Sequence, residues 1–175
     1  QDCPACHTGL QVGYLTEVGR LDEAIRLGEA RQGSCNREPT GTLHSLALAY
    51  LDTGRADDAV RAYQGAVATL ALSTGDFASA RGQAFELLAR GGHLAAALRD
   101  LREDYPQLLT HAATELARLR FLLGVLAGLA ANPDLRELEV GLRHPEVGTV
   151  EALHAWVHRE AAGLADSFDA RNGND

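Results

Sequence analysis

The feature that most constrains the fold is a glycine-centred turn motif that occurs three times. The segments Gly19–Ala24, Gly54–Ala59 and Gly92–Ala97 each begin with glycine and end with alanine, and their glycines lie 35 and then 38 residues apart. Glycine is favoured where a helix ends, because it enters the left-handed region without a Cβ clash. Apolar residues at helical spacing flank the turns. The repetition therefore predicts a series of antiparallel helix hairpins.

The clearest copy is the stretch 43–71, which reads as two short helices joined at Gly54. The apolar face of the first helix consists of Leu43, Leu46, Ala47, Tyr50 and Leu51. The apolar face of the second helix consists of Ala59, Tyr63, Ala66, Val67 and Leu70. Asp57 and Asp58 open the second helix, where the helix dipole favours negative charge. We expect the small Ala59 to let the two helices approach closely.

The composition agrees with an all-α fold. Hydrophobic residues make up 46% of the chain and aromatic residues only 5%, with many alanines and leucines and few β-branched side chains. Such a composition favours helix over strand. The formal net charge is −8, which disfavours nucleic acid as a partner.

Membrane insertion and export are not expected. The longest apolar run, residues 121–131, has 11 residues, whereas a helix needs about 20 to span a bilayer. No secretory signal is visible, and three cysteines do not suit a disulfide framework. We therefore expect a cytoplasmic protein. The chain starts at Gln1 and contains no methionine, so we also expect it to be a piece of a longer protein.

A single helical domain is expected, with hairpins over residues 3–110 and capping or bracing helices over 111–175. Residues 1–6 are expected to be non-helical. Outside the central hairpin, helices are predicted at residues 7–18, 21–31, 77–90, 94–104, 112–131, 134–142 and 150–168. Asp76 and Thr110 are the expected N-caps of the helices at 77–90 and 112–131. Gly124 and Gly128 suit close packing against another helix.

The hairpin resembles the tetratricopeptide repeat (TPR), a helix-turn-helix unit of about 34 residues. The positions that match the family pattern are Leu46, Tyr50, Gly54, Ala59, Tyr63 and Ala66. Ala47 stands where the family usually has glycine, and the terminal proline is absent at Ala71. In stacked repeats of this kind, residues of the first helices line a concave groove.

The residues expected in that groove are Glu17, His44, Leu48, Asp52, Glu86 and Arg90. An exposed Leu48 beside Asp52 and Arg90 would suit a short peptide or a partner helix. The alternative is ordinary surface, since three repeats form only a shallow groove.

The most chemically loaded stretch is Cys3–His7. Two thiolates at Cys-x-x-Cys spacing can bind one tetrahedral metal ion, and Cys35 would supply a third. First helices of neighbouring repeats run roughly parallel, so their N-terminal ends lie side by side and bring Cys35 near the pair. We favour His44 as the fourth ligand. His7 is the alternative, although its position next to Cys6 strains simultaneous binding.

A closer resemblance is to poorly characterised TPR proteins, chiefly from actinobacteria, that begin with a Cys-Pro-x-Cys pair and carry a later cysteine. The matching residues are Cys3, Pro4, Cys6, Cys35, Glu38 and Pro39. The family histidine falls on Thr40, and His44 lies one helical turn further on. The resemblance covers about residues 3–110. It implies the repeat fold and a structural metal site, and no established activity.

Three other interpretations of the cysteines remain open. Cys-x-x-Cys-His is also the c-type haem attachment motif, which requires export. Cys-Pro-Ala-Cys is similar to a glutaredoxin-type redox motif, which sits on a strand-containing framework. The third interpretation is three structural thiols without metal, since free cysteine often behaves as a small buried hydrophobe.

The predicted function is therefore a TPR-like interaction scaffold with a structural zinc site in its N-terminal repeat. The expected partner is a protein or peptide, with a homo-oligomer as a further possibility, and no catalytic residues are assigned. One alternative is a thiol-redox or metal-dependent enzyme that uses Cys3 and Cys6. Another is a regulatory module of a larger signalling or transcriptional protein.

Overall fold

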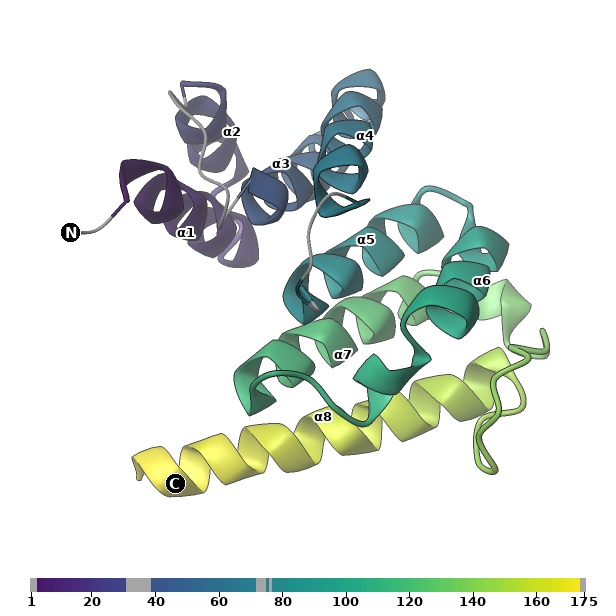
Figure 1. Cartoon of the computed structure of the whole chain (residues 1–175). Coiled ribbons are helices and arrows are strands. Elements are labelled where there is room, and N and C mark those ends of the chain that lie inside the picture. Colours follow the sequence, from purple (N-terminus) through teal and green to yellow (C-terminus); the bar gives the residue numbers. More distant parts are fainter. Residues whose placement is uncertain (1–2, 31–38, 72–74, 76, 174–175) are drawn as a thin grey trace. The chain divides into compact units, whose positions relative to one another are not determined.

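The computed structural model describes residues 3–30, 39–71, 75 and 77–173. The α-helices in these ranges are α1 (Pro4–Glu17), α2 (Leu21–Glu29), α3 (Pro39–Asp52), α4 (Ala56–Ala71), α5 (Ala78–Arg90), α6 (Leu94–Asp104), α7 (Glu115–Ala130) and α8 (Val150–Asn172) (Figure 1). Two short 3-10 helices are η1 (Pro106–Leu109) and η2 (Pro133–Leu135). An isolated bridge joins Glu139 and Thr149, and no β-strand forms in the described ranges. The all-α prediction is confirmed.

The chain separates into two compact units, residues 1–75 with α1 to α4 and residues 76–175 with α5 to α8. The expected single domain with a division near residue 110 stays a prediction. Among the helices that the structure describes, none is both long enough and apolar enough to cross a bilayer.

The three turn glycines adopt one conformation. Gly19, Gly54 and Gly92 have φ angles of 75°, 74° and 84° and follow α1, α3 and α5. The N–H of the residue after each glycine donates to the carbonyl five residues earlier, in the pairs Arg20–Leu15, Arg55–Tyr50 and His93–Leu88, each at 2.8 Å. The glycine N–H donates to the carbonyl three residues earlier, at 3.1, 3.1 and 3.2 Å. This is the Schellman arrangement of helix termination, so the predicted helix ends are confirmed.

The residues after the turns follow the same pattern. Ala24, Ala59 and Ala97, each five residues beyond its glycine, are 0%, 6% and 0% exposed. In the first two copies an arginine also pairs with an acid three residues later. Arg20 Nη2 lies 2.6 Å from Glu23 Oε2, and Arg55 Nε lies 2.6 Å from Asp58 Oδ2. Each turn thus joins two helices that pack closely through a small residue.

In the unit 1–75, α3 is the central helix and packs against α1, α2 and α4. It contacts α1 at Ser45, where a Cβ on Gly13 would lie 3.6 Å from the Ser45 Oγ, an ordinary van der Waals distance. The Thr16 hydroxyl also donates to the Ser45 carbonyl at 3.4 Å. A Cβ on Gly28 of α2 would overlap the side chain of Leu46. The missing Cβ of Gly28 therefore lets α2 approach α3 closely at Leu46, whereas the α1 contact leaves room for a Cβ at Gly13.

A polar contact links α2, α3 and the turn after α3. The Tyr50 hydroxyl and the Arg55 Nη2 both donate to the Glu29 Oε1, each at 3.0 Å. The Arg55 guanidinium also lies 4.5 Å from the centroid of the Tyr50 ring. Burial, followed by the hydrogen bond to Glu29, raises the pKa of Tyr50. The phenol is therefore held in its protonated, donating form.

In the unit 76–175, α5 and α7 cross almost backbone to backbone. A Cβ on Gly82 would lie 2.7 Å from the Phe121 Cα, and one on Gly124 would overlap the Gly82 main chain. A Cβ on Gly128 would lie 2.9 Å from both the Ala89 Cβ and the Phe85 ring. The predicted close packing at Gly124 and Gly128 is confirmed.

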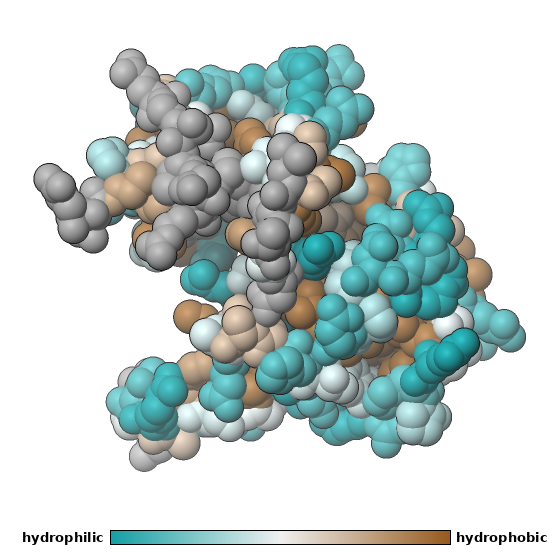
Figure 2. All heavy atoms as spheres, viewed as in Figure 1, coloured by the Kyte–Doolittle hydropathy of each residue, from teal (hydrophilic) through white to brown (hydrophobic). Residues whose placement is uncertain are grey.

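The other elements of this unit pack around that crossing. α6 packs on α5 and α8 packs on α7. Buried apolar side chains from all four helices form one core, with Phe85, Leu101, Phe121 and Leu153 each fully buried. Figure 2 shows hydrophilic residues over α6 on the face viewed, as expected for a helix with one apolar face.

Two helix starts differ from the prediction. α1 begins at Pro4, with Cys3 as its N-cap residue, so residues 4–6 are helical. Proline fits the first helical turn because its missing N–H would be unpaired there. α7 is capped by Thr114, whose hydroxyl accepts from the Ala117 N–H at 3.1 Å, whereas Thr110 ends η1. Asp76, the cap predicted for α5, lies outside the described residues.

The helix predicted at 134–142 is wrong. Only η2 forms there, and the chain then turns back at Gly141, whose φ is 66°. The Val140 N–H donates to the Gly148 carbonyl at 3.1 Å, and the Val150 N–H donates to the Leu138 carbonyl at 2.9 Å. This loop buries Val140 and Val147 to 1% exposure. Burying these two valines in the core outweighs the local helical pattern.

Candidate functional site

Cys3 and Cys6 lie one helical turn apart at the start of α1. Cys3 is the N-cap residue, and its carbonyl accepts from the His7 N–H at 3.0 Å. Both cysteine residues are half-buried. A helix N-terminus favours negative charge, so the position suits thiolate ligands.

The two candidate histidines lie in different environments. His44 is fully buried in α3, and its ring is edge-on to Tyr63 with centroids 6.3 Å apart. His7 is exposed on α1. Among the described residues, no group of three or more His, Cys, Asp or Glu side chains is placed to hold a metal ion. Cys35 lies outside the described residues, so the four-ligand zinc set stays a prediction.

The predicted groove residues of the unit 1–75 differ in exposure. Glu17 and Asp52 are exposed at the C-terminal ends of α1 and α3. Leu48 is only 7% exposed, so the expectation of an exposed Leu48 is wrong. The reason is that α3 is buried at every position from Thr42 to Tyr50 except Leu43, which is half-buried. A helix that is apolar on all sides is typical of a core helix.

The remaining groove residues belong to the unit 76–175. The Arg90 Nη1 donates to the Glu86 Oε1 at 3.0 Å, one helical turn apart on α5. The two side chains are 28% and 16% exposed. Because Glu86 and Arg90 lie in a different unit from Glu17 and Asp52, a groove that contains all four stays a prediction.

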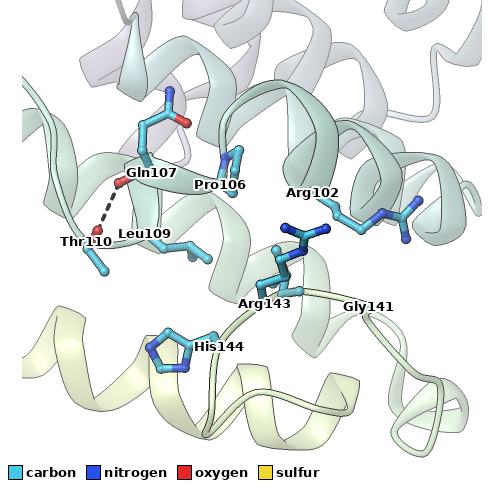
Figure 3. Close-up of a pocket in the computed structure, with 9 residues that line it drawn as sticks. Arg102, Pro106, Gln107, Leu109, Thr110, Gly141, Arg143 and His144 are labelled. Carbon is cyan, nitrogen blue, oxygen red and sulfur yellow. Dashed lines mark hydrogen bonds between the residues drawn. The ribbon is translucent and has the colours of Figure 1, made fainter.

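A surface depression of about 670 Å³ lies in the unit 76–175. The end of α6, η1 and the loop around Gly141 form its walls (Figure 3). The lining residues are Arg102, Pro106, Gln107, Leu109, Thr110, Gly141, Leu142, Arg143 and His144. Sequence reasoning missed this site, because the residues come from segments with no common motif. The only local signal is the adjacent Arg143 and His144 in a loop between glycine and proline.

The polar groups of the depression are partly engaged with each other and with their neighbours. The Arg102 Nη2 donates to the Glu103 Oε1 at 3.0 Å, and the Thr110 hydroxyl donates to the Gln107 carbonyl at 3.2 Å. The His144 Nδ1 accepts from the Glu146 N–H at 3.3 Å. The His144 ring packs edge-on against Trp156 with centroids 5.1 Å apart. The His144 ring therefore contacts both the Glu146 main chain and the Trp156 ring at the edge of the depression.

The repeat-like turns, the N-terminal thiols and this depression are the features that any assignment of function has to use. Comparison with protein-family models, with curated proteins and with solved structures found no match for the chain.

Proposed function

We propose that the protein is a TPR-like interaction scaffold whose partner is a protein or peptide. The observation that supports this proposal is the threefold occurrence of one turn geometry between consecutive helices. The turns after α1, α3 and α5 share the left-handed glycine, the same pair of main-chain hydrogen bonds and a buried alanine five residues later. Arrays of such hairpins present extended surfaces formed by successive first helices.

An exposed apolar stripe along α1 and its C-cap residue, Val18, supports a binding role. Leu10, Tyr14 and Val18 follow each other at intervals of four residues and are 67%, 60% and 48% exposed. Residues at this spacing lie on one face of a helix. Contiguous exposed apolar surface is common where proteins bind each other. The acidic Glu17 beside this stripe favours a partner segment that combines apolar and basic residues.

Affinity capture with matched variants tests the scaffold proposal. We expect Tyr14→Asp to abolish capture of any partner that the unaltered chain retains, because a charge within the stripe prevents apolar docking. Val60→Asp, on the exposed face of α4 (53% exposed), is the control and should retain the partner. If both variants capture the partner as well as the unaltered chain does, the stripe is not the binding surface.

We further propose that Cys3 and Cys6 bind a structural zinc ion together with Cys35 and His44. The support is the placement of the first two thiols one turn apart at a helix N-terminus. The same placement also suits a reactive thiol, so a thiol-redox activity is the second candidate. Metal analysis with an absorption spectrum of purified, untagged protein separates the two.

About one zinc per chain is expected for a closed site. Cys3→Ser, Cys6→Ser and Cys35→Ser should each release metal and lower the melting temperature. His44→Ala should also release metal if His44 is the fourth ligand. Loss of metal in His7→Ala instead would identify His7 as the fourth ligand. Unchanged metal content in the cysteine variants would refute the zinc site. Absence of metal with fast-reacting thiols would favour redox chemistry, and a Soret band would favour haem.

A further inference from the structure

We propose that the depression between α6, η1 and the loop around Gly141 binds the phosphate group of a small phosphorylated organic molecule. The proposal concerns the unit 76–175 alone and does not depend on the scaffold or the zinc site. It is carried by the arrangement of Arg102 and Arg143 around one depression and by the contacts of the neighbouring carboxylates.

Two guanidinium groups from distant parts of the sequence line the same depression. Arg102 lies in the last turn of α6, and Arg143 lies in the loop after η2. In Figure 3 the Arg143 side chain rises from the loop toward the end of α6 that carries Arg102. Like charges that share a depression repel each other unless an anion lies between them.

The nearby carboxylates of the described residues leave Arg143 unpaired and hold Arg102 only in an exposed ion pair. Glu146, three residues after Arg143, pairs with Arg159 of α8 at 2.8 Å. Glu103 contacts Arg102, but both side chains are well exposed, at 58% and 41%, and exposed pairs contribute little. Within the described part of the chain, no hydrogen bond or ion pair engages the Arg143 guanidinium. An anion in the depression would therefore meet one guanidinium without an acidic partner among these residues, that of Arg143, and one in a weak, exposed ion pair, that of Arg102.

The backbone at Gly141 passes close to the Arg102 side chain. A Cβ at Gly141 would lie 3.1 Å from the Arg102 Nη1 and 3.4 Å from its Cδ. The φ of 66° at Gly141 is also a conformation that other residues rarely adopt. The loop therefore accommodates the arginine side chain because this position has neither a Cβ nor an ordinary backbone conformation.

Neutral donors at the depression complement the two arginines. The Gln107 side chain carries an amide NH₂ group, and Thr110 carries a hydroxyl that can rotate toward a ligand. The His144 Nδ1 accepts a main-chain N–H, so the neutral ring carries its proton on Nε2. A phosphate monoester has a charge near −2 and three acceptor oxygens. That charge matches the two guanidinium groups, whereas a carboxylate neutralises only one.

The size and the walls of the depression favour an organic phosphate over the inorganic ion. A volume of about 670 Å³ lies within the range of small-molecule sites, which is about 300–1,000 Å³. Pro106, Leu109 and Leu142 provide apolar surface beside the polar groups. This surface would contact the carbon skeleton of the ligand.

Titration of the full chain with phenyl phosphate, inorganic phosphate and benzoate, followed by amide NMR shifts at constant ionic strength, tests the proposal. We expect phenyl phosphate to shift amides of residues 106–110 and 141–144 saturably. Inorganic phosphate should bind more weakly because it lacks the organic part. Benzoate has the same ring with a single negative charge and should bind about tenfold more weakly than phenyl phosphate.

Arginine variants assign the binding to these residues. Arg143→Gln and Arg102→Gln should each weaken phenyl phosphate binding about tenfold. Arg120→Gln, which removes the same charge from an exposed position on α7, should leave the binding unchanged. Arg143 is exposed and its guanidinium makes no ion pair, so its variant should retain the fold and the amide spectrum elsewhere.

Three results would overturn the proposal. One is the lack of saturable shifts with phenyl phosphate, and another is equal binding of benzoate. The third is an affinity for phenyl phosphate that Arg143→Gln and Arg102→Gln leave unaltered. Inorganic phosphate that binds as tightly as phenyl phosphate would overturn the organic part of the assignment.

Discussion

At the scale of single residues, two glycines of the unit 76–175 differ in backbone conformation but have the same open space around them. Gly92 ends α5 with a φ of 84°, and Gly163 lies within the regular helix α8. A Cβ added at either position would meet no atom within 4 Å. An added Cβ therefore makes no steric contact at either position, and the two glycines differ only in their backbone conformation.

Gly92→Ala should lower the free energy of unfolding by about 1–2 kcal/mol, because an L-residue is strained in the left-handed region. Gly163→Ala should raise it by about 0.5–1 kcal/mol, because alanine loses less conformational entropy in a helix. Chemical denaturation of both variants checks the pair. Changes of the same sign would contradict the backbone explanation.

Tyr50→Phe removes the hydroxyl that donates to Glu29 and should cost about 1 kcal/mol at neutral pH. Burial, followed by the Glu29 hydrogen bond, raises the pKa of Tyr50 in the folded state. The stabilisation is therefore complete below the ordinary tyrosine pKa of about 10 and is lost as the pH rises through the folded-state value. The stability difference between the two proteins should shrink in denaturation experiments at alkaline pH.

Tyr14→Phe is the control for this experiment. Tyr14 is 60% exposed on α1, so its loss should leave the free energy of unfolding unchanged at neutral pH. A difference between Tyr50→Phe and the unaltered chain that stays constant up to about pH 11 would contradict the assigned role of the phenol.

At the scale of elements, the crossing of α5 and α7 has no room for an added methyl group. Gly124→Ala would place its Cβ against the Gly82 main chain, and Gly82→Ala would place it 2.7 Å from the Phe121 Cα. Backbone atoms cannot move aside as a flexible side chain can. Each change should therefore lower the free energy of unfolding by about 3 kcal/mol, a typical cost of overpacking.

Thermal or chemical unfolding measures this loss, with Gly163→Ala as the matched glycine-to-alanine control in the same unit. The double variant Gly82→Ala/Gly124→Ala should cost less than the sum of the single changes. Both substitutions push the same two helices apart, and contacting residues are not additive. Additive costs would mean that the two glycines act separately.

The local sequence was sufficient to predict the structure where particular residues mark the ends of helices. Gly19, Gly54 and Gly92 predicted three turns, and α6 has the predicted bounds of Leu94–Asp104. The spacing of Gly124 and Gly128 predicted close packing, although it does not reveal that the partner is α5 at Gly82. The partner of a small-residue face depends on tertiary arrangement, which a local pattern does not contain.

The errors arose where distant packing determines the conformation. Residues 134–142 have a helical pattern, but the segment forms a loop that buries Val140 and Val147 in the core. Leu48 fits the expected exposed face of α3, yet it is buried together with most of that helix. The depression was not predictable, because Arg102 and Arg143 come together only through the return of the loop at Gly141. The ligands of the zinc site remain predictions from spacing.

At the scale of the whole molecule, residues cluster into the units 1–75 and 76–175. We therefore expect Gly82→Ala to reduce hydrogen-exchange protection throughout α5 to α8 and to leave the slowest amides of α3 unchanged. Native-state hydrogen exchange measures this directly, because cooperative units lose protection together. An equal loss of protection in α3 would show that the chain unfolds as the single domain predicted from its sequence.

The repeated turn also bears on the ancestry of the chain. Two copies keep an arginine–acid pair across the turn, whereas His93 and Ala96 stand at those positions in the third. All three copies still close through the same main-chain hydrogen bonds. If the copies arose by duplication, side-chain pairing was free to diverge, while the glycine and the alanine five positions later were retained. A descendant of the same ancestral hairpin would then be recognised by those two residues after its remaining sequence had changed beyond alignment.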